Sequence, residues 1–377
     1  MGDIGGFAVD AACGAARVGQ FALRSLTVTT PLFMPVATRG VVRYVPAGQV
    51  EAAGYQVLLS NTYHLMLRPG SKRIADLGGL KHFTGFRGAS LTDSGGYQVM
   101  SLGAEIDDAG ATFRSVYDGS VVTLTPEAAT IEQELIGADI AMALDVCTKL
   151  PSDRGTIKAN AERTERWAYR AREAKSDPEQ LQFGIVQGGV DLEIREFSAT
   201  GIVKVGFDGY AIGGLAVGES PDLTLAAVER SVEFLPRDRP RYLMGVGDPY
   251  LLVHSVALGV DMFDCVAPTR LARHGTALTR SGRLRLRNAR HLESDEPIDR
   301  LCGCETCRRH SRALIAHLLR VDAESAGALI SLHNLRFQMD LINETRRAIL
   351  ENRFEEFVSG VDRVWGQHEP SGTANSD

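Results

Sequence analysis

The 377-residue sequence lacks a disulfide framework, a membrane-spanning run and a signal peptide. Six cysteines are too few to cross-link a chain of this length, and three of them fall within residues 302–307. No apolar run reaches the length of a membrane helix, and residues 1–14 do not show the basic and then apolar order of a signal peptide. These absences predict a cytoplasmic protein that does not contact a membrane.

The sequence also lacks an excess of basic residues. Its 41 Lys and Arg residues are outnumbered by 47 Asp and Glu residues, so the net charge is −6 and does not by itself indicate a nucleic-acid partner. Residues 265–292 differ from the rest, because they contain no acidic residue but seven arginines: Arg270, Arg273, Arg280, Arg283, Arg285, Arg287 and Arg290. Arg283, Arg285 and Arg287 occupy every second position, so a strand there would have a basic face. Such a run is typical of a phosphate-binding surface or of a merely solvated one.

Short apolar runs alternate with helical segments over most of the chain, which favours a parallel sheet. Helices are predicted to begin after Thr125, Ser220 and Asp248. Each of these is a capping residue, and a proline follows it at the first helical position. Seven apolar runs end in a polar or glycine-rich turn, at Asn61, Asp93, Asp145, Gln187, Gly213, Gly245 and Asp264. This recurrence predicts an α/β fold, a (β/α)8 TIM-type barrel, although its eighth strand has no clear signal. An open, doubly wound sheet is the alternative.

The domain organisation follows from these patterns. We expect a single catalytic barrel domain over residues 1–377, with a zinc-binding subdomain at 300–345 inserted near the C-terminus. The polar tail 366–377 is expected to be disordered.

Cys302, Cys304 and Cys307 lie within six positions, and His333 follows after 25 intervening residues. Three thiolates and one imidazole complete a closed tetrahedral Zn²⁺ site with no position left for water. The spacing therefore predicts one structural zinc per chain. The alternatives are free thiols beside a packed histidine, or His310 as the fourth ligand.

Asp93, Asp145 and Asp264 each follow a strand-like run, where a solvated surface charge is not expected. One such aspartate is more often a helix cap or turn former, but three on one barrel rim suit glycosidic chemistry. One carboxylate can attack an anomeric carbon while another moves a proton. Asp264 is the predicted nucleophile because the basic run begins six residues later, at Arg270.

Glycine-rich turns follow two strand-like runs, at residues 95–96 and 213–214. Backbone without a Cβ can approach a planar ligand, and it can equally form a tight barrel loop. Tyr97 and Met244, each beside a strand end, could stack on a base, although such residues are more often part of a core.

Together these motifs resemble the queuine tRNA-ribosyltransferase (tRNA-guanine transglycosylase) family, bacterial type. The resemblance runs in unbroken order from about residue 30 to residue 364. It is carried by the segments FMPV, SNTYHLMLRPG, LTDSGGYQVMSL, DGS, GIVQGG, IGGLAVGE, YLMGVG, MFDCVAPTR and CGCETC…HNLRF.

The resemblance implies a zinc-bearing barrel that exchanges the wobble guanine of GUN-anticodon tRNAs for a deazaguanine base through a covalent ribosyl-aspartate intermediate. In this chain it implies Asp264 as the nucleophile and Asp93 as the residue of proton transfer. The residues that resemble the base-binding set are Asp93, Ser94, Tyr97, Asp145, Gln187, Gly214, Leu215 and Met244, with Tyr97 and Met244 as the stacking pair. Arg270 and Arg273 resemble residues that contact the tRNA anticodon loop, and the family resemblance also implies a homodimer.

Cys147 and Val217 resemble the pocket of bacterial members, which incorporate 7-aminomethyl-7-deazaguanine in queuosine biosynthesis. A queuine-salvaging transglycosylase is the alternative. The chain departs from many relatives at Val146, where glutamate is frequent, and at Asp248, where lysine is frequent.

Two other functions fit parts of the pattern. A non-catalytic tRNA-binding partner subunit would not need Asp93, Asp145, Gln187 and Asp264 together. A retaining sugar hydrolase on the same fold would use two rim carboxylates but would have no evident use for the cysteine cluster and the arginine run.

Overall fold

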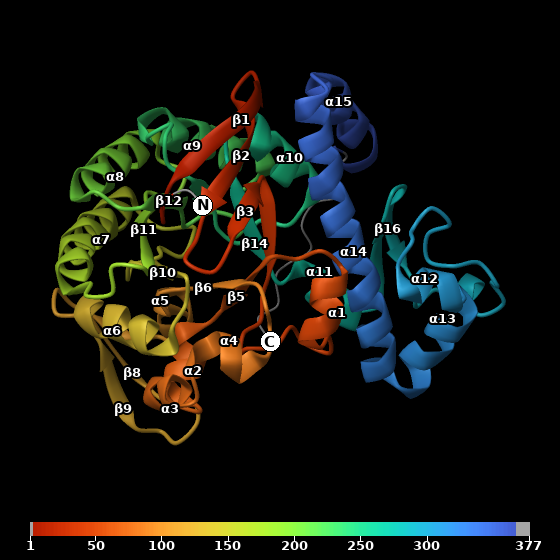
Figure 1. Cartoon of the computed structure of the whole chain (residues 1–377), viewed down its shortest axis with the longest axis horizontal. Helices are drawn as coiled ribbons and strands as arrows, with labels where there is room; N and C mark the ends of the chain where they lie inside the picture. The colour runs from red at the N-terminus through yellow and green to blue at the C-terminus, as the bar shows by residue number, and fades with distance from the viewer. Residues whose placement is uncertain (1–2, 367–377) are drawn as a thin grey trace.

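The centre of the molecule is a parallel barrel in the computed structural model, which describes residues 3–366 (Figure 1). Within these residues eight strands form one sheet, in the order β4-β14-β13-β12-β11-β10-β6-β5, and every neighbouring pair is parallel. Between the two edge strands, Val36 bridges Leu59, and the Ala37 N–H donates to the Leu59 carbonyl at 2.6 Å. The (β/α)8 barrel prediction is confirmed. The strands are β4 (Leu32–Pro35), β5 (Val57–Ser60), β6 (Ala89–Thr92), β10 (Ile140–Met142), β11 (Leu181–Val186), β12 (Gly209–Ile212), β13 (Arg241–Leu243) and β14 (Met262–Cys265).

The eighth strand, which has no clear signal in the sequence, is β4, the first barrel strand along the chain. It is four residues long and ends in Pro35, so it carries neither a long apolar run nor a polar turn. Two expected strand ends need correction. Asp264 lies inside β14, paired with Met34 of β4, and Asp145 lies three residues beyond the end of β10 at Met142.

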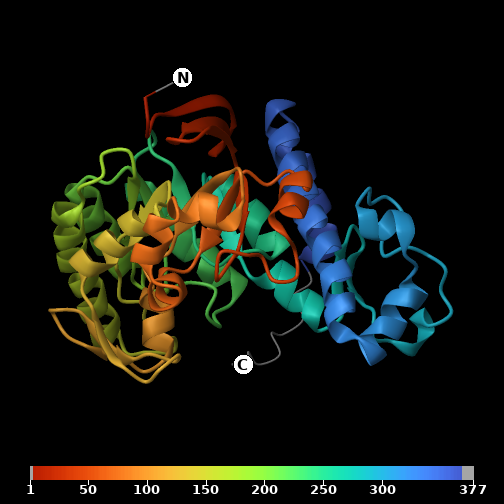
Figure 2. The same ribbon diagram turned by 60° about the horizontal axis from the view of Figure 1, so that its bottom comes forward.

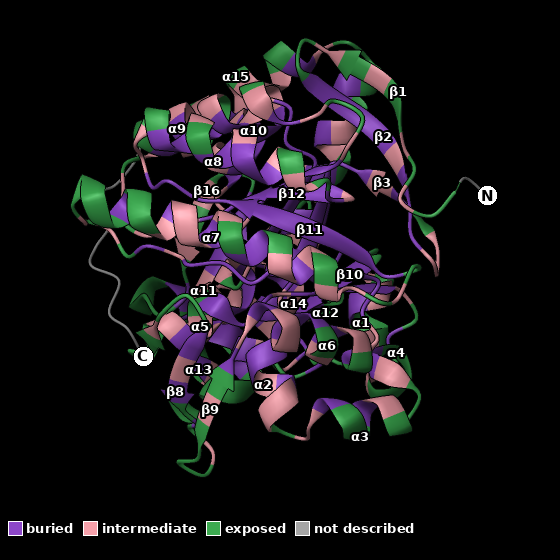
Figure 3. Ribbon diagram, turned by 90° about the vertical axis from the view of Figure 1, so that its left-hand side faces the viewer, coloured by how far each residue is buried: buried purple, intermediate pink, exposed green. Residues whose placement is uncertain are grey.

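Helices surround the barrel, and their outward faces are exposed while the strands are buried (Figure 3). The predicted helix starts are confirmed, because the side chains of Thr125, Ser220 and Asp248 accept hydrogen bonds from backbone N–H groups of the first helical turn. Gly137 ends the first of these helices with φ 78°. The helices on the barrel side are α1 (Ala47–Ala52), α2 (Thr62–Leu67), α3 (Ser71–Asp76), α4 (Gly79–Thr84), α5 (Gly96–Ser101), α6 (Pro126–Ile136), α7 (Arg154–Ala174), α8 (Leu192–Val205), α9 (Pro221–Phe234) and α10 (Pro249–Ala257).

Two small antiparallel sheets accompany the barrel. The first, β1 (Phe7–Cys13), β2 (Ala16–Ala22) and β3 (Thr27–Thr30), inserts Phe21 against Phe183 at the N-terminal end of the barrel interior, with ring centroids 6.0 Å apart. The second sheet lies between α5 and α6 in the chain and contains β7 (Glu105–Ile106), β8 (Ala111–Arg114) and β9 (Val121–Leu124).

The C-terminal part of the chain lies beside the barrel, at the opposite end of the molecule from β8 and β9 (Figures 1 and 2). The long helix α14 lies between the barrel and the smaller helices, and the Tyr55 hydroxyl donates to its Leu335 carbonyl at 2.7 Å. Nearly all of the expected tail, residues 367–377, lies outside the described residues. The elements of this part are α11 (Ala267–Arg273), β15 (Thr276–Thr279), β16 (Gly282–Arg285), η1 (Ala289–His291), α12 (Glu305–Arg309), α13 (Arg312–Val321), α14 (Ala323–Leu350) and α15 (Phe354–Trp365).

A search of residues 3–366 for a helix that could cross a bilayer finds none that is both long and apolar enough.

Candidate active site and zinc-binding cluster

The alternation of side chains along the barrel strands gathers the candidate site residues. Successive side chains of a strand point to opposite faces, so every second one enters the barrel. In β6, Ala89 and Leu91 belong to the interior cluster, and Asp93 is the next position of that series. Gln187 continues the series of Phe183 and Ile185 in β11 in the same way. The polar residues therefore follow the buried interior at the carboxyl ends of the strands, where barrel enzymes place their chemistry.

Asp264 continues the interior series from Met262 and is held from one side. The Tyr242 hydroxyl donates to Asp264 Oδ1 at 2.6 Å, and the Gly245 N–H donates to the same oxygen at 2.8 Å. Burial raises the pKa of Asp264, while both hydrogen bonds act in the opposite direction. Among residues 3–366 no donor reaches Oδ2, so this oxygen keeps its electron pairs for another group.

Asp93 is more heavily hydrogen-bonded than Asp264. The N–H groups of Thr62 and Gly95 donate to Oδ1 at 2.9 Å and 3.2 Å, and the Asn61 side-chain amide donates to Oδ2. Burial nevertheless raises the pKa of Asp93 to about 6, and the nearby charge of Asp264 contributes in the same direction. A carboxyl group whose pKa lies this close to neutral pH is suited to proton transfer as a general acid or base.

Asp145, Ser94 and Gln187 form a buried hydrogen-bonded group. Ser94 Oγ donates to Asp145 Oδ1 at 3.1 Å, and Gln187 Nε2 donates to Asp145 Oδ2 at 2.6 Å. Burial raises the pKa of Asp145 to about 6, while the two hydrogen bonds lower it. Gln187 Oε1 is buried and accepts no hydrogen bond from residues 3–366. Buried acceptors are normally paired, so this oxygen has an unused capacity to accept a hydrogen bond.

The glycine turn after β12 packs directly against this group. Gly214 has φ 67°, and a Cβ built there would lie 2.4 Å from Gln187 Oε1. The fully buried Arg195 links two turns, because its guanidinium donates to the carbonyls of Gly189 at 2.7 Å, Val186 at 3.2 Å and Gly214 at 3.4 Å. Only a residue without a side chain fits at position 214, so the backbone itself lines this side of the site.

Glu219 holds the loop that continues from this turn. Its two carboxylate oxygens accept hydrogen bonds from the N–H groups of Ala216 and Val217, and from the Thr224 hydroxyl at 2.8 Å. The peptide between Leu215 and Ala216 is trans and planar, so the Leu215 carbonyl points away from Glu219. Leu215 itself is buried.

The two residues expected to stack on a base have different environments. Met244 is partly buried, and its sulfur lies 3.6 Å from the Cβ position built at Gly213. Tyr97 is 59% exposed on α5, next to Gly96, whose Cβ position is 2.8 Å from the Asp145 carbonyl oxygen. Tyr97 therefore follows the glycine that packs on Asp145, and Met244 lies beside the glycine that packs on Gln187.

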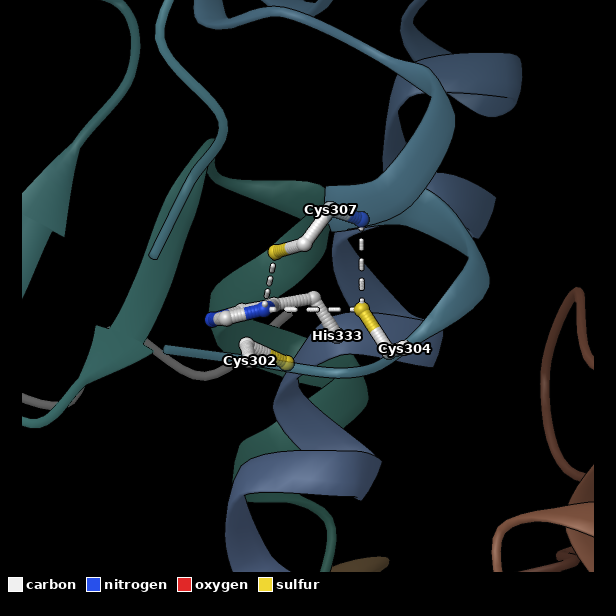
Figure 4. Close-up of side chains that lie close together, drawn as sticks. All are labelled: Cys302, Cys304, Cys307 and His333. Carbon is white, nitrogen blue, oxygen red and sulfur yellow. Dashed lines mark hydrogen bonds between the residues drawn. The ribbon is translucent and has the colours of Figure 1, made fainter. Parts of the chain in front are cut away.

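Four metal-binding side chains converge at the start of α12 and the middle of α14 (Figure 4). The ligand atoms of Cys302, Cys304, Cys307 and His333 all lie within 4.8 Å of one another, and His333 Nδ1 is 3.2 Å from the Cys307 sulfur. His333 Nε2 lies 2.7 Å from the Leu278 carbonyl, an outer partner that directs Nδ1 toward the thiols. This donor set fits a closed tetrahedral Zn²⁺ site and confirms the predicted zinc ligands, with His333 as the fourth.

The arginine run forms an irregular basic surface. Arg270 is exposed near the end of α11, and Arg273 is partly buried, its Nε without a hydrogen-bond partner among residues 3–366. Burial, and then the charges of Arg43 and Arg270, lower the pKa of Arg273. Arg283 and Arg285 are exposed on β16, as the alternation predicts, whereas Arg287 lies beyond the strand and donates to backbone carbonyls.

The two departures from the family pattern fit their surroundings. Val146 is buried in an apolar cluster with Leu144 and Trp167. Asp248 caps α10 and lies 3.1 Å from Arg283, so it links this helix to β16. Neither position leaves a buried charge without a partner.

Sequence reasoning missed Tyr242, Asn61 and Arg195. Tyr242 occupies an interior position of β13, and the strand alternation together with its hydroxyl could have identified it as a partner for a rim carboxylate. The sequence indicates Asn61 as a strand end but not as a donor to Asp93. Arg195 has no signal in the sequence, because an arginine at a helix start is ordinarily exposed.

Comparisons with known proteins point to one family over nearly the whole chain. A family model described as queuine tRNA-ribosyltransferase matches residues 11–367. A protein named queuine tRNA-ribosyltransferase from Thermus thermophilus is 51% identical over 354 residues, which cover 93% of this chain and 92% of the relative. Proteins of the same name from Thermotoga neapolitana and Cereibacter sphaeroides are 49% and 45% identical, and they cover 95% and 97% of this chain and 98% of each relative.

Proposed function

The chain belongs to the queuine tRNA-ribosyltransferase family, and from this premise we propose that it exchanges the wobble guanine of GUN-anticodon tRNAs for a deazaguanine base. The observation that carries the proposal is the one-sided binding of Asp264. Its Oδ1 accepts hydrogen bonds from Tyr242 and Gly245, whereas no donor within residues 3–366 reaches Oδ2 at the carboxyl end of the barrel.

The proposed reaction passes through a covalent ribosyl-aspartate intermediate. Asp264 Oδ2 forms an ester bond to the ribose C1′ while the bond from C1′ to guanine N9 breaks, and protonated Asp93 gives its proton to the leaving base. The incoming base then loses a proton to ionised Asp93, and its nitrogen attacks C1′ and displaces Asp264. Two displacements at one carbon retain its configuration.

Asp145 and Gln187 are proposed to read the edge of the base. A guanine-like base presents N–H donors on this edge, and the Asp145 carboxylate with the unpartnered Gln187 Oε1 supplies acceptors. The backbone of Gly214 and Leu215 completes the edge, and Tyr97 and Met244 are proposed to stack on the two faces. A base that reacts must leave its helical stack, so such contacts hold the flipped base.

We favour 7-aminomethyl-7-deazaguanine as the incoming base. An aminomethyl group is a cation that needs an acceptor, and the Leu215 carbonyl, turned away from Glu219, provides one. Cys147 and Val217 belong to the same region, since the Val217 N–H donates to Glu219 and Cys147 lies near Asp145. Queuine has a bulkier substituent at this position, and we treat its use as the second candidate.

The remaining parts have proposed supporting roles. The zinc ion held by the four ligands is structural, because its donor set leaves no open position. Arg270 and Arg273 are proposed to contact the phosphates of the anticodon loop. We further propose a homodimer, tested by sedimentation, and a cytoplasmic location, which suits free thiols and a tRNA substrate.

The decisive experiment uses Asp264→Asn. The wild type, mixed with a GUN-anticodon tRNA and no free base, should form a covalent protein–RNA adduct, and Asp264→Asn should not, because an amide cannot form the ester. Asp108→Asn, a change at an exposed aspartate paired with Arg166, is the matched control and should form the adduct normally. An adduct on Asp264→Asn would refute the nucleophile, and comparing guanine, the aminomethyl base and queuine in exchange identifies the incoming base.

A further inference from the structure

A second basic and aromatic group lies at the catalytic rim, outside the arginine run. It consists of Tyr117, from the turn between β8 and β9, with Arg39 and Arg68, and we call these three residues the Tyr117 clamp. The guanidinium of Arg68 lies 4.8 Å from the centre of the Tyr117 ring, and that of Arg39 lies 5.8 Å from it. Both distances are within the range of cation–π attraction.

The clamp is close to the proposed chemistry along the chain and in space. Arg68 follows α2, whose first residues bind Asp93 through Thr62, and Figures 1 and 3 show α2 beside β8 and β9. Arg39 follows Thr38, whose carbonyl accepts from the Asn61 N–H at 3.3 Å, and Asn61 binds Asp93 in turn. The two arginines of the clamp therefore flank the segments that hold Asp93 in place.

Several hydrogen bonds hold the Tyr117 turn in its conformation. The Tyr117 hydroxyl lies 2.9 Å from His64 Nδ1, and the Tyr117 N–H donates to Ser115 Oγ at 3.2 Å. Asp118 Oδ1 accepts hydrogen bonds from the Ser120 N–H and hydroxyl, and the Ser115 N–H donates to the Ser120 carbonyl at 2.8 Å. A ring already fixed in place loses little entropy when a base stacks on it.

The charges around the ring favour an anion. Arg39 and Arg68 approach the same ring although their charges repel each other. Burial, and then the charge of Arg39, lowers the pKa of His64, so this histidine adds no third cation at neutral pH. Asp118 is the nearby carboxylate; hydrogen bonds from Ser120 and Ser115, and then the charge of Arg68, lower its pKa. Arg114 donates to the Gly119 carbonyl in the same turn. The local balance is positive in an acidic protein.

The loop between β4 and α1 connects the clamp to the arginine run. It contains Arg39, whose guanidinium lies over the Tyr117 ring, and Arg43, whose charge, after burial, lowers the pKa of Arg273. Strands β5, β4 and β14 are neighbours in the barrel, so α2, this loop and α11 follow one another around the rim. The exposed arginines Arg39, Arg43 and Arg270 are therefore distributed over neighbouring segments of this rim.

We infer that the Tyr117 clamp is a second RNA-binding surface, in which a nucleotide of the single-stranded anticodon loop beside the exchanged base stacks on Tyr117 while Arg39 and Arg68 bind its phosphates. Aromatic rings flanked by arginines bind single strands in this way without reading a specific base. The inference rests on the proposed function, because it assumes that the flipped base reacts at Asp264.

The test measures binding of a fluorescein-labelled RNA hairpin with a GUN anticodon loop by anisotropy at several salt concentrations, on the Asp264→Asn background so that no adduct forms. Tyr117→Ala should weaken binding about tenfold, the size expected for loss of one stacked base. Arg39→Ala and Arg68→Ala should each weaken binding and reduce the salt slope by about one. Tyr117→Phe keeps the ring and should bind almost normally.

Arg87→Ala is the matched control, since Arg87 is an exposed arginine next to the N-terminal end of β6, on the opposite rim of the barrel. It should leave affinity and salt slope unchanged. Thermal unfolding of each variant shows whether the β8–β9 segment of the protein is damaged. Binding of free guanine shows whether the base pocket is intact. Normal RNA binding by Tyr117→Ala and both arginine variants would overturn the inference, even if the wild type still exchanges guanine. Absence of an adduct in the wild type would instead overturn the proposed function.

Discussion

Removal of the Tyr242 hydroxyl tests how the barrel prepares its nucleophile. Tyr242 is fully buried, and its hydroxyl donates to Asp264 Oδ1 at 2.6 Å. This hydrogen bond stabilises the ionised carboxylate and so lowers the pKa of Asp264 against the effect of burial. Tyr242→Phe keeps the ring and removes only this donor. The pKa of Asp264 should therefore rise further, while the Gly245 N–H still holds the same oxygen.

The size of the shift follows from the strength of such a bond. A hydrogen bond to a charged group contributes about 1.5–3 kcal/mol. Each pH unit corresponds to about 1.4 kcal/mol, so the pKa of Asp264 should rise by about one to two units. Attack on C1′ requires the ionised carboxylate, and adduct formation is lost when pH falls through the pKa. The acidic limb of the rate profile should therefore move to higher pH by the same amount.

Rapid-quench measurement of adduct formation with excess enzyme, over a pH range from acidic to mildly alkaline, isolates this step. Tyr55→Phe is the matched control, because it removes another buried tyrosine hydroxyl, whose partner is the distant Leu335 carbonyl. It should lower thermal stability without moving the limb. If Tyr242→Phe lowers the rate equally at every pH, the hydroxyl positions Asp264 but does not tune its ionisation, and the reasoning fails.

Two further predictions concern the zinc and the RNA. Cys304→Ser should lower both zinc content, measured by metal analysis, and thermal stability, because binding at a structural site is coupled to folding; His310→Ala should retain zinc, and loss of zinc from it would contradict the assignment of His333. Replacing both Arg270 and Arg273 by alanine should raise the Kd for tRNA and reduce its salt slope by about one to two, with free-base binding unchanged. Equal loss of free-base binding would instead place these arginines in the pocket.

The barrel and the metal cluster were predictable because their signals are local. Capping residues such as Thr125 are adjacent to the helices that they begin, and three cysteines within six positions leave few alternatives to a metal. Strand β4 was not predictable, because four residues ending in Pro35 have no alternation to detect. The side-chain partners of the carboxylates were also beyond reach, since Tyr242 and Asp264 are 22 residues apart and meet only through the pairing of β13 with β14.

The proposed division of labour between the two carboxylates follows from how their electron pairs are used. An ionised carboxylate has about four lone-pair positions. Asp93 uses three of them, for Thr62, Gly95 and Asn61, so it retains a place for one proton but no free oxygen. Within the described part of the chain, Asp264 uses two, both on Oδ1, and its second oxygen accepts no hydrogen bond. Burial raises the pKa of both groups, so ionisation alone does not distinguish them. The placement of the hydrogen-bond donors does distinguish the two carboxylates. It suits Asp93 to carry a proton and Asp264 to form a bond to carbon.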